Sequence, residues 1–373
     1  MAPDAPDAPT SDLSPDLSSA WRRTRPPRTT LHLDSAAAGR SSWAVLDATA
    51  QHARREAERG GYVAAQEVSD LLDATRRHVL DLLGWAEGIV AFVHSAEDAW
   101  RQVLLGWPGD LPVTVAHARG EYGPNLTVLR RLGIGTSEVA GPHRLDPAAF
   151  EASLAANRPD LLHLTWLGSH VGTVQPVAEV AALARAAGVP VVVDAAQAFG
   201  HVDTTGATDV DVVYGTSRKW LAGPRGVGFV AVRGDLADRM GGLEQAEAHV
   251  AGRVGFATAV AEHVALGPAA VHAGLAALGS RTRRRLADEL SGTWEVVEDL
   301  DEPSATVTLR PREAIDLAGL RAELIARDGI VTTYVGPERA PGEMTTPTLR
   351  VSGHLDTTDE DVDALARALL RRS

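Results

Sequence analysis

Two segments of the 373-residue chain hold residue types that can do covalent chemistry on a small molecule. The apolar segment VVVD ends at Asp194, and the segment GTSRKWLAGPRG carries Lys219, which is the only lysine in the sequence. A carboxylate keeps a neighbouring pyridine nitrogen protonated, and a lysine amine forms a Schiff base with an aldehyde. Pyridoxal phosphate needs both groups, so this pair indicates a site for that cofactor.

Each of the two residues also has a simpler interpretation. An aspartate at the end of a strand is often the N-cap of the next helix, and most lysines are solvated surface charges. The composition favours the catalytic interpretation of Lys219. Of the 36 lysine and arginine residues, all the others are arginine, which cannot form the imine.

The overall composition limits the classes of partner that we expect. The sequence is 45% apolar and carries a formal net charge of −13, which argues against nucleic acid or an anionic membrane as the main partner. No apolar run is long enough to cross a bilayer, and the N-terminus lacks the pattern of a secretory signal, so we expect a cytoplasmic protein. The chain has no cysteine, which excludes disulfides, thiolate metal sites and a thiol nucleophile.

The order of the predicted elements indicates an α/β protein with two domains and a tail. Residues 1–30 are rich in proline, alanine, aspartate and serine, and we expect them to be mostly disordered. Over residues 31–252, which include an N-terminal arm, apolar strands alternate with amphipathic helices, as is typical of a large, mainly parallel sheet covered on both faces. We expect its strands at residues 89–93, 113–116, 137–139, 161–165, 189–194, 210–214 and 227–232.

The pattern changes over residues 253–373, for which we expect a smaller C-terminal α+β domain. This part begins with a long helix that reaches the arginine run of residues 281–285, and shorter strands and helices follow. Most charged side chains are solvated, so we expect the arginine run to be an exposed helix end. In open α/β sheets the ligand lies at the carboxyl ends of the strands, which is where Asp194 stands.

Three segments taken together resemble a known family. VVVDAAQAFGHVD, GTSRKWLAGPRGVGF and TLRVSGHLDTTDEDVDAL are similar to motifs of the class V aminotransferase group of fold-type I pyridoxal phosphate enzymes. The resemblance covers most of the chain from Leu31 onward. It implies an amino acid as the small-molecule substrate, and a homodimer with its active sites at the subunit interface.

Around the ring of the cofactor, the resemblance implies roles for several residues. Asp194 would pair with the pyridine nitrogen, Lys219 would carry the covalent link, and Gln197 would approach the ring hydroxyl. Tyr122, in GEYGPN, would lie against the face of the ring, although a core or surface tyrosine remains an alternative. Ser169, in TWLGSHVG, stands where the family usually has an asparagine that contacts the ring hydroxyl.

At the phosphate of the cofactor, the resemblance points to the segment HSAEDAW. Ser95 and the backbone amides of Ala96 and Glu97 would bind the phosphate at a helix N-terminus, where free amides and the helix dipole favour an anion. Ser95 is equally suited to be an ordinary N-cap, and the two roles are compatible. Ser217 would add a hydroxyl, whereas Phe256 replaces the family threonine that reaches the phosphate of the partner subunit.

For the substrate, the resemblance points to Arg350 in LRVS. This arginine matches the one that binds the substrate α-carboxylate in the family, and a planar guanidinium suits a bidentate carboxylate. The alternative is a solvated arginine on a surface strand. The 13 histidines show no spacing typical of metal ligands, so we expect no metal.

The absence of cysteine narrows the reaction. In such a site Lys219 would remove the α-proton of an amino acid. The cysteine desulfurases of this group use a catalytic cysteine on the loop before the arginine, where this chain has APGEMTTPT. A persulfide-forming desulfurase is therefore excluded, whereas β-elimination needs no thiol.

A finer resemblance lies in LDSAAAGRSS, RGGYVAAQE, DAAQAFGHVD and SRKWLAGPRGVGF, which are similar to the hercynylcysteine sulfoxide lyases of ergothioneine biosynthesis. This implies C–S cleavage of a cysteine sulfoxide that bears a trimethylated histidine, giving pyruvate, ammonia and a sulfenate that is reduced to ergothioneine. Quaternary ammonium groups favour aromatic rings, so we hypothesise that Trp43, Tyr62 or Trp166 lines that part of the site. The alternative is that these side chains are core anchors.

Other functions remain open from the sequence alone. Another enzyme of the same group is one alternative: a general cysteine-conjugate lyase, an aminotransferase, an epimerase or a kynureninase-like hydrolase. The other is a binding or regulatory protein with the fold of a pyridoxal phosphate enzyme. The combined presence of Asp194, Lys219 and Arg350 argues against this second class.

Overall fold

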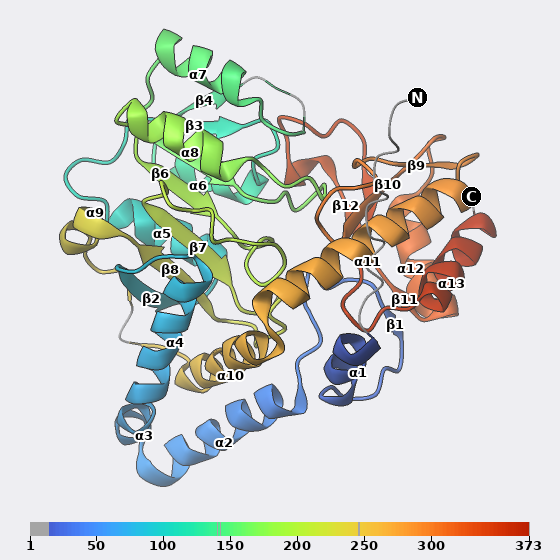
Figure 1. Cartoon of the computed structure of the whole chain (residues 1–373), viewed down its shortest axis with the longest axis horizontal. Helices are drawn as coiled ribbons and strands as arrows, with labels where there is room; N and C mark the ends of the chain where they lie inside the picture. The colour runs from blue at the N-terminus through green and yellow to red at the C-terminus, as the bar shows by residue number, and fades with distance from the viewer. Residues whose placement is uncertain (1–14, 140, 142, 245–246, 373) are drawn as a thin grey trace, which may run out of the picture.

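A sheet of mostly apolar strands lies at the centre of the large domain (Figure 1). The computed structural model describes residues 15–372, except 140, 142 and 245–246. The sheet has seven strands in the order β2-β8-β7-β6-β5-β3-β4, and β8 alone runs antiparallel to its neighbours. The strands are β2 (Ile89–Val93), β3 (Thr114–Ala118), β4 (Gly135–Val139), β5 (Leu161–Thr165), β6 (Val191–Asp194), β7 (Val212–Thr216) and β8 (Gly228–Val232). This confirms the predicted mainly parallel sheet.

Helices bury both faces of this sheet, because neighbouring residues of a strand point to opposite sides. One face packs on α4 (Ser69–Leu82), α7 (Pro147–Ala156), α8 (Val177–Ala186) and α10 (Val250–Leu266). The other packs on α5 (Ala96–Leu105), α6 (Gly123–Arg131) and α9 (Gly234–Arg239). Side chains that point to the α5–α6 face at the carboxyl ends of the strands are therefore placed to meet a ligand.

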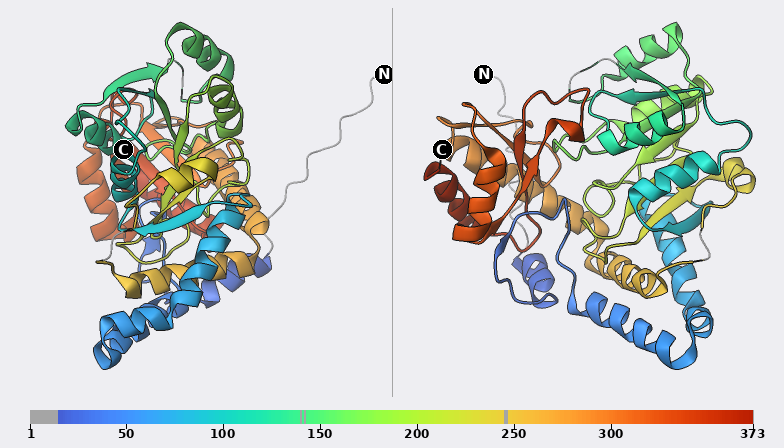
Figure 2. Two further views of the ribbon diagram at one scale, coloured as in Figure 1. Left: turned by 90° about the vertical axis from the view of Figure 1, so that its left-hand side faces the viewer. Right: turned by 180° about the vertical axis from the view of Figure 1, so that it is seen from behind.

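A helical arm precedes the sheet and projects from the molecule (Figure 2). It comprises α2 (Trp43–Arg59), α3 (Gly61–Glu67) and α4, and α10 packs against α2 and α4. The chain turns between α2 and α3 at Gly60, whose φ of 87° lies in the region that favours glycine.

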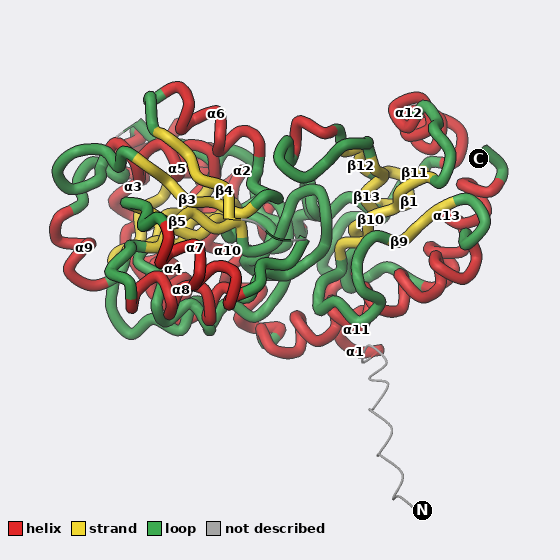
Figure 3. Tube along the Cα trace, turned by 90° about the horizontal axis from the view of Figure 1, so that it is seen from above, coloured by secondary structure: helices red, strands yellow, loops and turns green. Residues whose placement is uncertain are grey.

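A second, smaller sheet stands apart from the first, with loops between the two (Figure 3). It is antiparallel, in the order β12-β13-β10-β9, and β1 (Leu31–His32) pairs in parallel with β11 (Ile330–Val331) beside it. Its strands are β9 (Trp294–Val296), β10 (Thr306–Pro311), β12 (Thr333–Val335) and β13 (Thr348–Ser352), covered by α11 (Pro268–Glu289), α12 (Leu317–Asp328) and α13 (Asp359–Leu370). The short helix η1 (Pro337–Arg339) lies between β12 and β13.

Packing divides the chain differently from the predicted boundary at residues 252 and 253. Phe256 and Val260 of α10 belong to the core of the large sheet, whereas Leu33 belongs to the core of the small one. The expected single long helix is two helices, α10 and α11, which are bent by 84° at Gly267. The change between domains therefore falls at this glycine, and the segment before α2 belongs with the small domain.

Two other expectations differ from the structure. Pro15–Arg23 forms helix α1, in which Trp21 is buried and stacks on His354, although this segment was expected to be disordered; residues 1–14 of the expected tail lie outside the described residues. In the arginine run, Arg283 is fully buried, because its guanidinium donates to the backbone carbonyls of Leu300, Glu302, Ser304 and Thr306. The prediction of an exposed run was wrong for this residue.

No single helix in the described residues is long and apolar enough to cross a membrane. The pair α10 and α11 meets that test only when both are counted, across the bend between them.

Candidate active site

A cavity of about 190 Å³ lies where the carboxyl ends of β5, β6 and β7 face the small domain. Nine of the residues predicted from the sequence meet at this cavity: Ser95, Ala96, Glu97, Tyr122, Ser169, Asp194, Gln197, Lys219 and Arg350. Further residues that line it are Ala36, Ala37, Asn125, Thr165, Leu167, Ala196, Thr216, Arg218 and Arg339. Both domains therefore contribute to one site.

Asp194 ends β6 and is held from two sides. Its Oδ1 accepts a hydrogen bond from the backbone amide of Ala196 at 2.8 Å, and its Oδ2 accepts one from Asn125 Nδ2 at 3.0 Å. The side chain is buried, and it points to the α5–α6 face of the sheet together with Tyr214 of the neighbouring strand. A fixed, buried carboxylate of this kind suits the protonated nitrogen of a heteroaromatic ring.

Beneath Asp194 lies a buried polar network centred on Glu121. One carboxylate oxygen, Oε1, accepts hydrogen bonds from Asn125 Nδ2, from Thr165 Oγ1 and from the amide of Tyr122, at 2.8 to 2.9 Å. The other oxygen lies 2.9 Å from His163 Nδ1, and His163 Nε2 lies 2.8 Å from the Tyr214 hydroxyl.

The charges of this network are set by its neighbours. Burial raises the pKa of Glu121. The charge and hydrogen bond of His163 and the hydrogen bond of Asn125 outweigh this effect, so the net shift of the pKa is downward and Glu121 stays ionised. Burial, with the charge of Asp194, raises the pKa of Tyr214 well above 10, so its hydroxyl keeps its proton. Asn125 thus joins two carboxylates that both accept from its single amide group.

Lys219 stands on the loop after β7. Burial lowers the pKa of its amine to about 7, and Asp194 opposes this shift while the charges of Arg218, Arg350 and Arg339 add to it. A substantial fraction of the amine is therefore unprotonated and nucleophilic near neutral pH, as attack on an aldehyde requires.

The backbone of Lys219 is held closely by the segment that follows β1. The amide of Gly39 donates to the carbonyl of Arg218 at 2.7 Å. A Cβ atom at Gly39 would lie 2.4 Å from the Lys219 carbonyl oxygen, so only glycine allows this approach.

The N-terminus of α5 lines the cavity with Ser95, Ala96 and Glu97. Ser95 is its N-cap, with Oγ accepting from the amide of Asp98 at 3.0 Å, so the capping interpretation is confirmed. Thr216 and Arg218 line the same cavity as Ala96 and Glu97. Free helix amides, a hydroxyl and a guanidinium together suit a phosphate group.

Ser217 does not line the cavity with its neighbours Thr216 and Arg218. Side chains alternate along β7, so Thr216 shares the face of Tyr214 and Ser217 points away. Its Oγ is buried against Gly223, where a Cβ atom would lie 2.1 Å from it, and it has no hydrogen-bond partner among the described atoms. The sequence argument chose the wrong hydroxyl of this pair for the cavity.

Arg350 is almost fully buried in the wall formed by the small domain. Its guanidinium donates to the carbonyl of Ser169 at 2.6 Å and lies 3.4 Å from Asp34 Oδ1 and 3.3 Å from Thr333 Oγ1. Burial lowers its pKa to about 10, partly offset by Asp34, so it remains charged. A surface arginine is thereby excluded, and Arg350 is fixed in place for an anion in the cavity.

Gln197 lies between the cavity and the lysine loop. Its Nε2 donates to the carbonyl of Ala36 at 2.9 Å, and its Oε1 accepts from Trp220 Nε1 at 3.0 Å. The Trp220 ring stacks on His201, which fixes the residue next to Lys219. Gln197 therefore positions the lysine loop as well as lining the cavity.

The three aromatic residues proposed for a trimethylammonium group lie elsewhere in the chain. Trp166 is buried in the core on the α4–α8 face, because it shares the face of Leu162 and Leu164 on β5. Trp43 and Tyr62 lie on the helical arm and are 52% and 84% exposed. Within this single chain, none of them lines the cavity.

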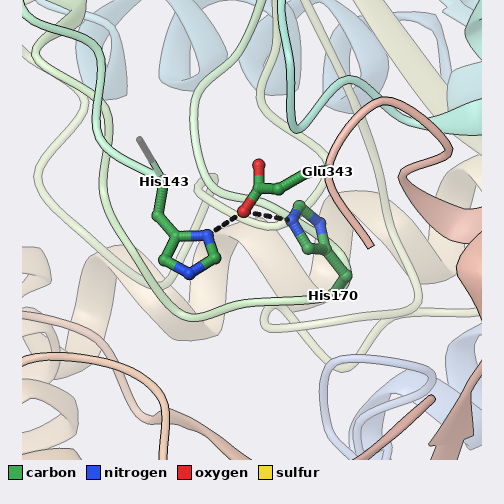
Figure 4. A group of neighbouring side chains, drawn as sticks. All are labelled: His143, His170 and Glu343. Carbon is green, nitrogen blue, oxygen red and sulfur yellow. Dashed lines mark hydrogen bonds and ion pairs between the residues drawn. The ribbon is translucent and has the colours of Figure 1, made fainter. Parts of the chain in front are cut away.

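Beside the cavity, a cluster of two histidines and a glutamate ties three loops together (Figure 4). Glu343, from the loop between η1 and β13, contacts His143 Nδ1 and lies 3.3 Å from His170 Nε2. Burial, and then the charge of His143, lowers the pKa of His170 to about 3, so this imidazole is neutral. These side chains have the types that ligate metal ions, which the spacing of the histidines did not indicate.

The nine further cavity residues were missed by the sequence argument, and they include Asn125, Thr216, Arg218 and Arg339. Asn125 could have been found from the sequence, because Tyr122 is the N-cap of α6 and Asn125 follows three residues later, in the first turn of that helix. Thr216 and Arg218 lie on either side of Ser217 in GTSRK. Because side chains alternate along a strand, these two residues point to the side opposite Ser217, and this alternation can be read from the sequence. Arg339 lies in η1, and no local pattern marks it.

Comparison with known proteins places this geometry in a family. The profile of the aminotransferase class-V family matches residues 31–365. The chain belongs to the class V aminotransferase family. Pyridoxal phosphate is the cofactor of this family, and the protein is an enzyme of the α/β type with the fold of its members.

Among relatives, the probable hercynylcysteine sulfoxide lyase of Mycobacterium tuberculosis is 48% identical to this chain over 380 residues, which cover 96% of this chain and 94% of the relative. Isopenicillin N epimerase of Streptomyces clavuligerus is 28% identical and covers 82% of this chain and 85% of its own length. Among solved structures, the apo cysteine desulfurase of Thermococcus onnurineus aligns with a TM-score of 0.82 at 18% identity, over 96% of this chain and 98% of its own.

The cavity fits the family cofactor on its own chemistry. Asp194 supplies a fixed carboxylate, Lys219 a neutral amine, and the N-terminus of α5 with Thr216 and Arg218 an anion site. Ser169 Oγ is buried at the cavity and has no hydrogen-bond partner among the described atoms, as expected of a hydroxyl that awaits a ligand.

We predict that loading of the apo-protein with pyridoxal phosphate follows the ionisation of Lys219. A pKa of about 7 leaves the amine protonated and unreactive below that pH and neutral above it. The rate at which the visible absorbance of the bound cofactor appears should rise with pH, with a midpoint near 7. Lys219→Ala, which removes the only side-chain amine, should show no such band. A midpoint near the usual lysine value of about 10.4 would contradict the burial argument.

We also predict that Glu121→Gln destabilises the protein. The change removes the charge that His163 faces and places an amide among donors, and breaking a buried ion pair costs about 3 to 5 kcal/mol. The thermal unfolding midpoint of the cofactor-loaded protein should fall by several degrees. Glu138→Gln, at an exposed ion pair with Arg119, is the matched control and should shift it little. Equal midpoints for the two variants would show that the buried network carries no special stability.

Proposed function

We propose that the protein is a pyridoxal phosphate-dependent C–S lyase that acts on hercynylcysteine sulfoxide. The observation that carries this proposal is the near full-length similarity, at 48% identity, to the probable hercynylcysteine sulfoxide lyase of Mycobacterium tuberculosis. The site agrees with it, since Asp194, Lys219 and Arg350 meet at one cavity and the chain has no cysteine. The products would be pyruvate, ammonia and a sulfenate, whose reduction gives ergothioneine.

The chemistry of the step assigns a task to each group of the chain. The cofactor, when bound, accepts the electron pair left on the α-carbon. Arg350 would hold the substrate α-carboxylate, and the Lys219 amine would take the α-proton. As the Cα–H bond breaks and a Cα–Cβ double bond forms, the Cβ–S bond breaks and its electron pair leaves with the sulfur. The three-carbon fragment that remains hydrolyses to pyruvate and ammonia.

The other cavity residues would hold the cofactor. We assign the ring nitrogen to Asp194, the ring hydroxyl to Gln197 and Ser169, and the ring face to Tyr122. The phosphate is assigned to Ser95 and the amides of Ala96 and Glu97, which are supported by Thr216 and Arg218 in place of Ser217.

The closest competing functions use the same first step. Removal of an α-proton also begins epimerisation, and a relative at 28% identity is an isopenicillin N epimerase. A general cysteine-conjugate lyase, an aminotransferase and a kynureninase-like hydrolase share this step too. A purely binding or regulatory role is disfavoured, because such a role does not require a lysine with a lowered pKa beside a fixed carboxylate.

Pyruvate release separates these functions. We predict that the cofactor-loaded protein releases pyruvate rapidly from hercynylcysteine sulfoxide and at least about 10-fold more slowly from S-methylcysteine sulfoxide, which lacks the betaine end. Lys219→Ala should abolish the reaction and Arg350→Gln should raise KM for both substrates. Comparable rates for both substrates would indicate a general cysteine-conjugate lyase. If no pyruvate forms and the product is racemised or transaminated instead, the protein is an epimerase or an aminotransferase and the lyase proposal is wrong.

We infer that two copies of the chain pair through the helical arm. Apolar side chains are exposed along α2 and α3: Trp43, Leu46, Tyr62 and Val63. Such an exposed apolar stretch marks an interaction surface. The fold of this family supports a second copy as the occupant, and Trp43 and Tyr62 would then act on substrate only at the partner's cavity. We place the enzyme in the cytoplasm as part of the same proposal.

The oligomeric state tests this pairing. Because a two-fold interface presents each residue twice, Leu46→Asp and Tyr62→Asp should each weaken the dimer by at least about 2 kcal/mol. Light scattering after gel filtration should show dimers for the wild type and monomers for the variants. Leu105→Asp, at an exposed position on α5, is the matched control and should stay dimeric. Monomeric wild-type protein would contradict the inference.

A further inference from the structure

The cavity holds more positive charge than its own acidic groups balance. The charged side chains that line it are Glu97, Asp194, Arg218, Lys219, Arg339 and Arg350. Glu97 is already paired with Arg101. In the part of the chain that the structure describes, neither Arg218 nor Arg339 forms an ion pair, although both are only partly exposed. Guanidinium groups that are partly desolvated and unpaired indicate anionic ligands.

The arginines that line the cavity come from both domains. Arg218 follows β7 in the large domain, next to Thr216 and the N-terminus of α5, which form the anion site for a phosphate. Arg339 and Arg350 come from the small domain, on either side of the loop that carries Glu343. One of the two therefore remains after the substrate α-carboxylate has been accommodated.

Arg339 is held in place by close packing of η1. A Cβ atom at Gly123 would lie 2.0 Å from the carbonyl oxygen of Glu338, so the glycine allows η1 to approach the start of α6. This brings the Arg339 guanidinium over the Tyr122 ring, with 5.9 Å between Cζ and the ring centroid. An arginine over an aromatic face is favourable and is oriented by the ring.

The ligand of the proposed function supplies a matching group. Hercynylcysteine sulfoxide has one carboxylate on the cysteine α-carbon and a second on the trimethylated histidine at its far end. We propose, resting on the proposed function, that Arg339 binds this second carboxylate and so selects substrates that carry a betaine end. Arg350 keeps the α-carboxylate.

The burial of the two arginines decides which carboxylate each one takes. Arg350 is 2% exposed and is fixed by Ser169 and Asp34, so it serves a group that must be placed accurately beside Lys219. Arg339 lies at a less buried position over Tyr122, as suits the end of the substrate that is remote from the reacting carbon. A small S-alkylcysteine sulfoxide has no group for Arg339 and loses that interaction.

The experiment compares two substrates that differ in one carboxylate. Pyruvate release is measured for hercynylcysteine sulfoxide and for its analogue in which the histidine carboxylate is replaced by hydrogen, with wild type, Arg339→Gln and Arg339→Lys. We expect Arg339→Gln to lower the preference for the carboxylate-bearing substrate, as a ratio of kcat/KM, by about 10- to 100-fold. The loss should lie mainly in KM, and Arg339→Lys should restore part of the preference.

A binding measurement provides a second readout that does not depend on turnover. Hercynine, the trimethylated histidine itself, should inhibit the wild type competitively, and its inhibition constant should rise about 10-fold or more in Arg339→Gln. Arg284→Gln, at an exposed ion pair with Asp301, is the matched control and should leave both readouts unchanged.

The possible outcomes distinguish a failure of the role assigned to Arg339 from a failure of the proposed lyase function. If wild type releases no pyruvate from either hercynyl substrate, the proposed function fails and this inference fails with it. If wild type reacts but Arg339→Gln affects both substrates equally, or affects neither, the proposed function stands and the role of Arg339 is wrong. A changed cofactor absorbance in Arg339→Gln, with the substrate ratio unchanged, would assign Arg339 to the cofactor instead.

Discussion

The buried carboxylate of Glu121 is the group on which the geometry around Asp194 depends. An ionised side chain is costly to bury unless its oxygens are fully hydrogen-bonded, and here donors from the chain before α6, from α6 itself and from β5 surround it. The same contacts fix Asn125, which donates to Asp194 as well. The functional carboxylate is therefore placed by a second carboxylate that never meets the ligand.

Both domains contribute charged groups to the site. The large domain supplies the fixed carboxylate, the lysine, a helix N-terminus and Arg218, and the small domain supplies Arg339 and Arg350. Burial, followed by the charges of these three arginines, lowers the pKa of Lys219, while Asp194 opposes this shift. The positive potential that attracts an anionic substrate is thus the same one that keeps the lysine reactive.

Local pattern predicted the large sheet well, because buried parallel strands are continuous apolar runs. It also identified Asp194 and Lys219, whose types are demanded by the chemistry. The resemblance pointed to Ser217, but β7 extends to Thr216, and alternation along this strand puts Thr216 and not Ser217 at the cavity. The burial of Arg283 and the order of α1 rest on contacts with segments distant in sequence, such as Trp21 with His354, which no local pattern reveals.

The short segment between β1 and α2 has a mechanical consequence. At one end, Leu33 and Ser35 are hydrogen-bonded to β11 and β13 of the small domain, and at the other Gly39 is hydrogen-bonded to the backbone beside Lys219. Only residues 36–38 lie between these two anchors, and Ala36 and Ala37 face the cavity. Any rotation of the small sheet relative to the large one would therefore pull on the backbone beside Lys219.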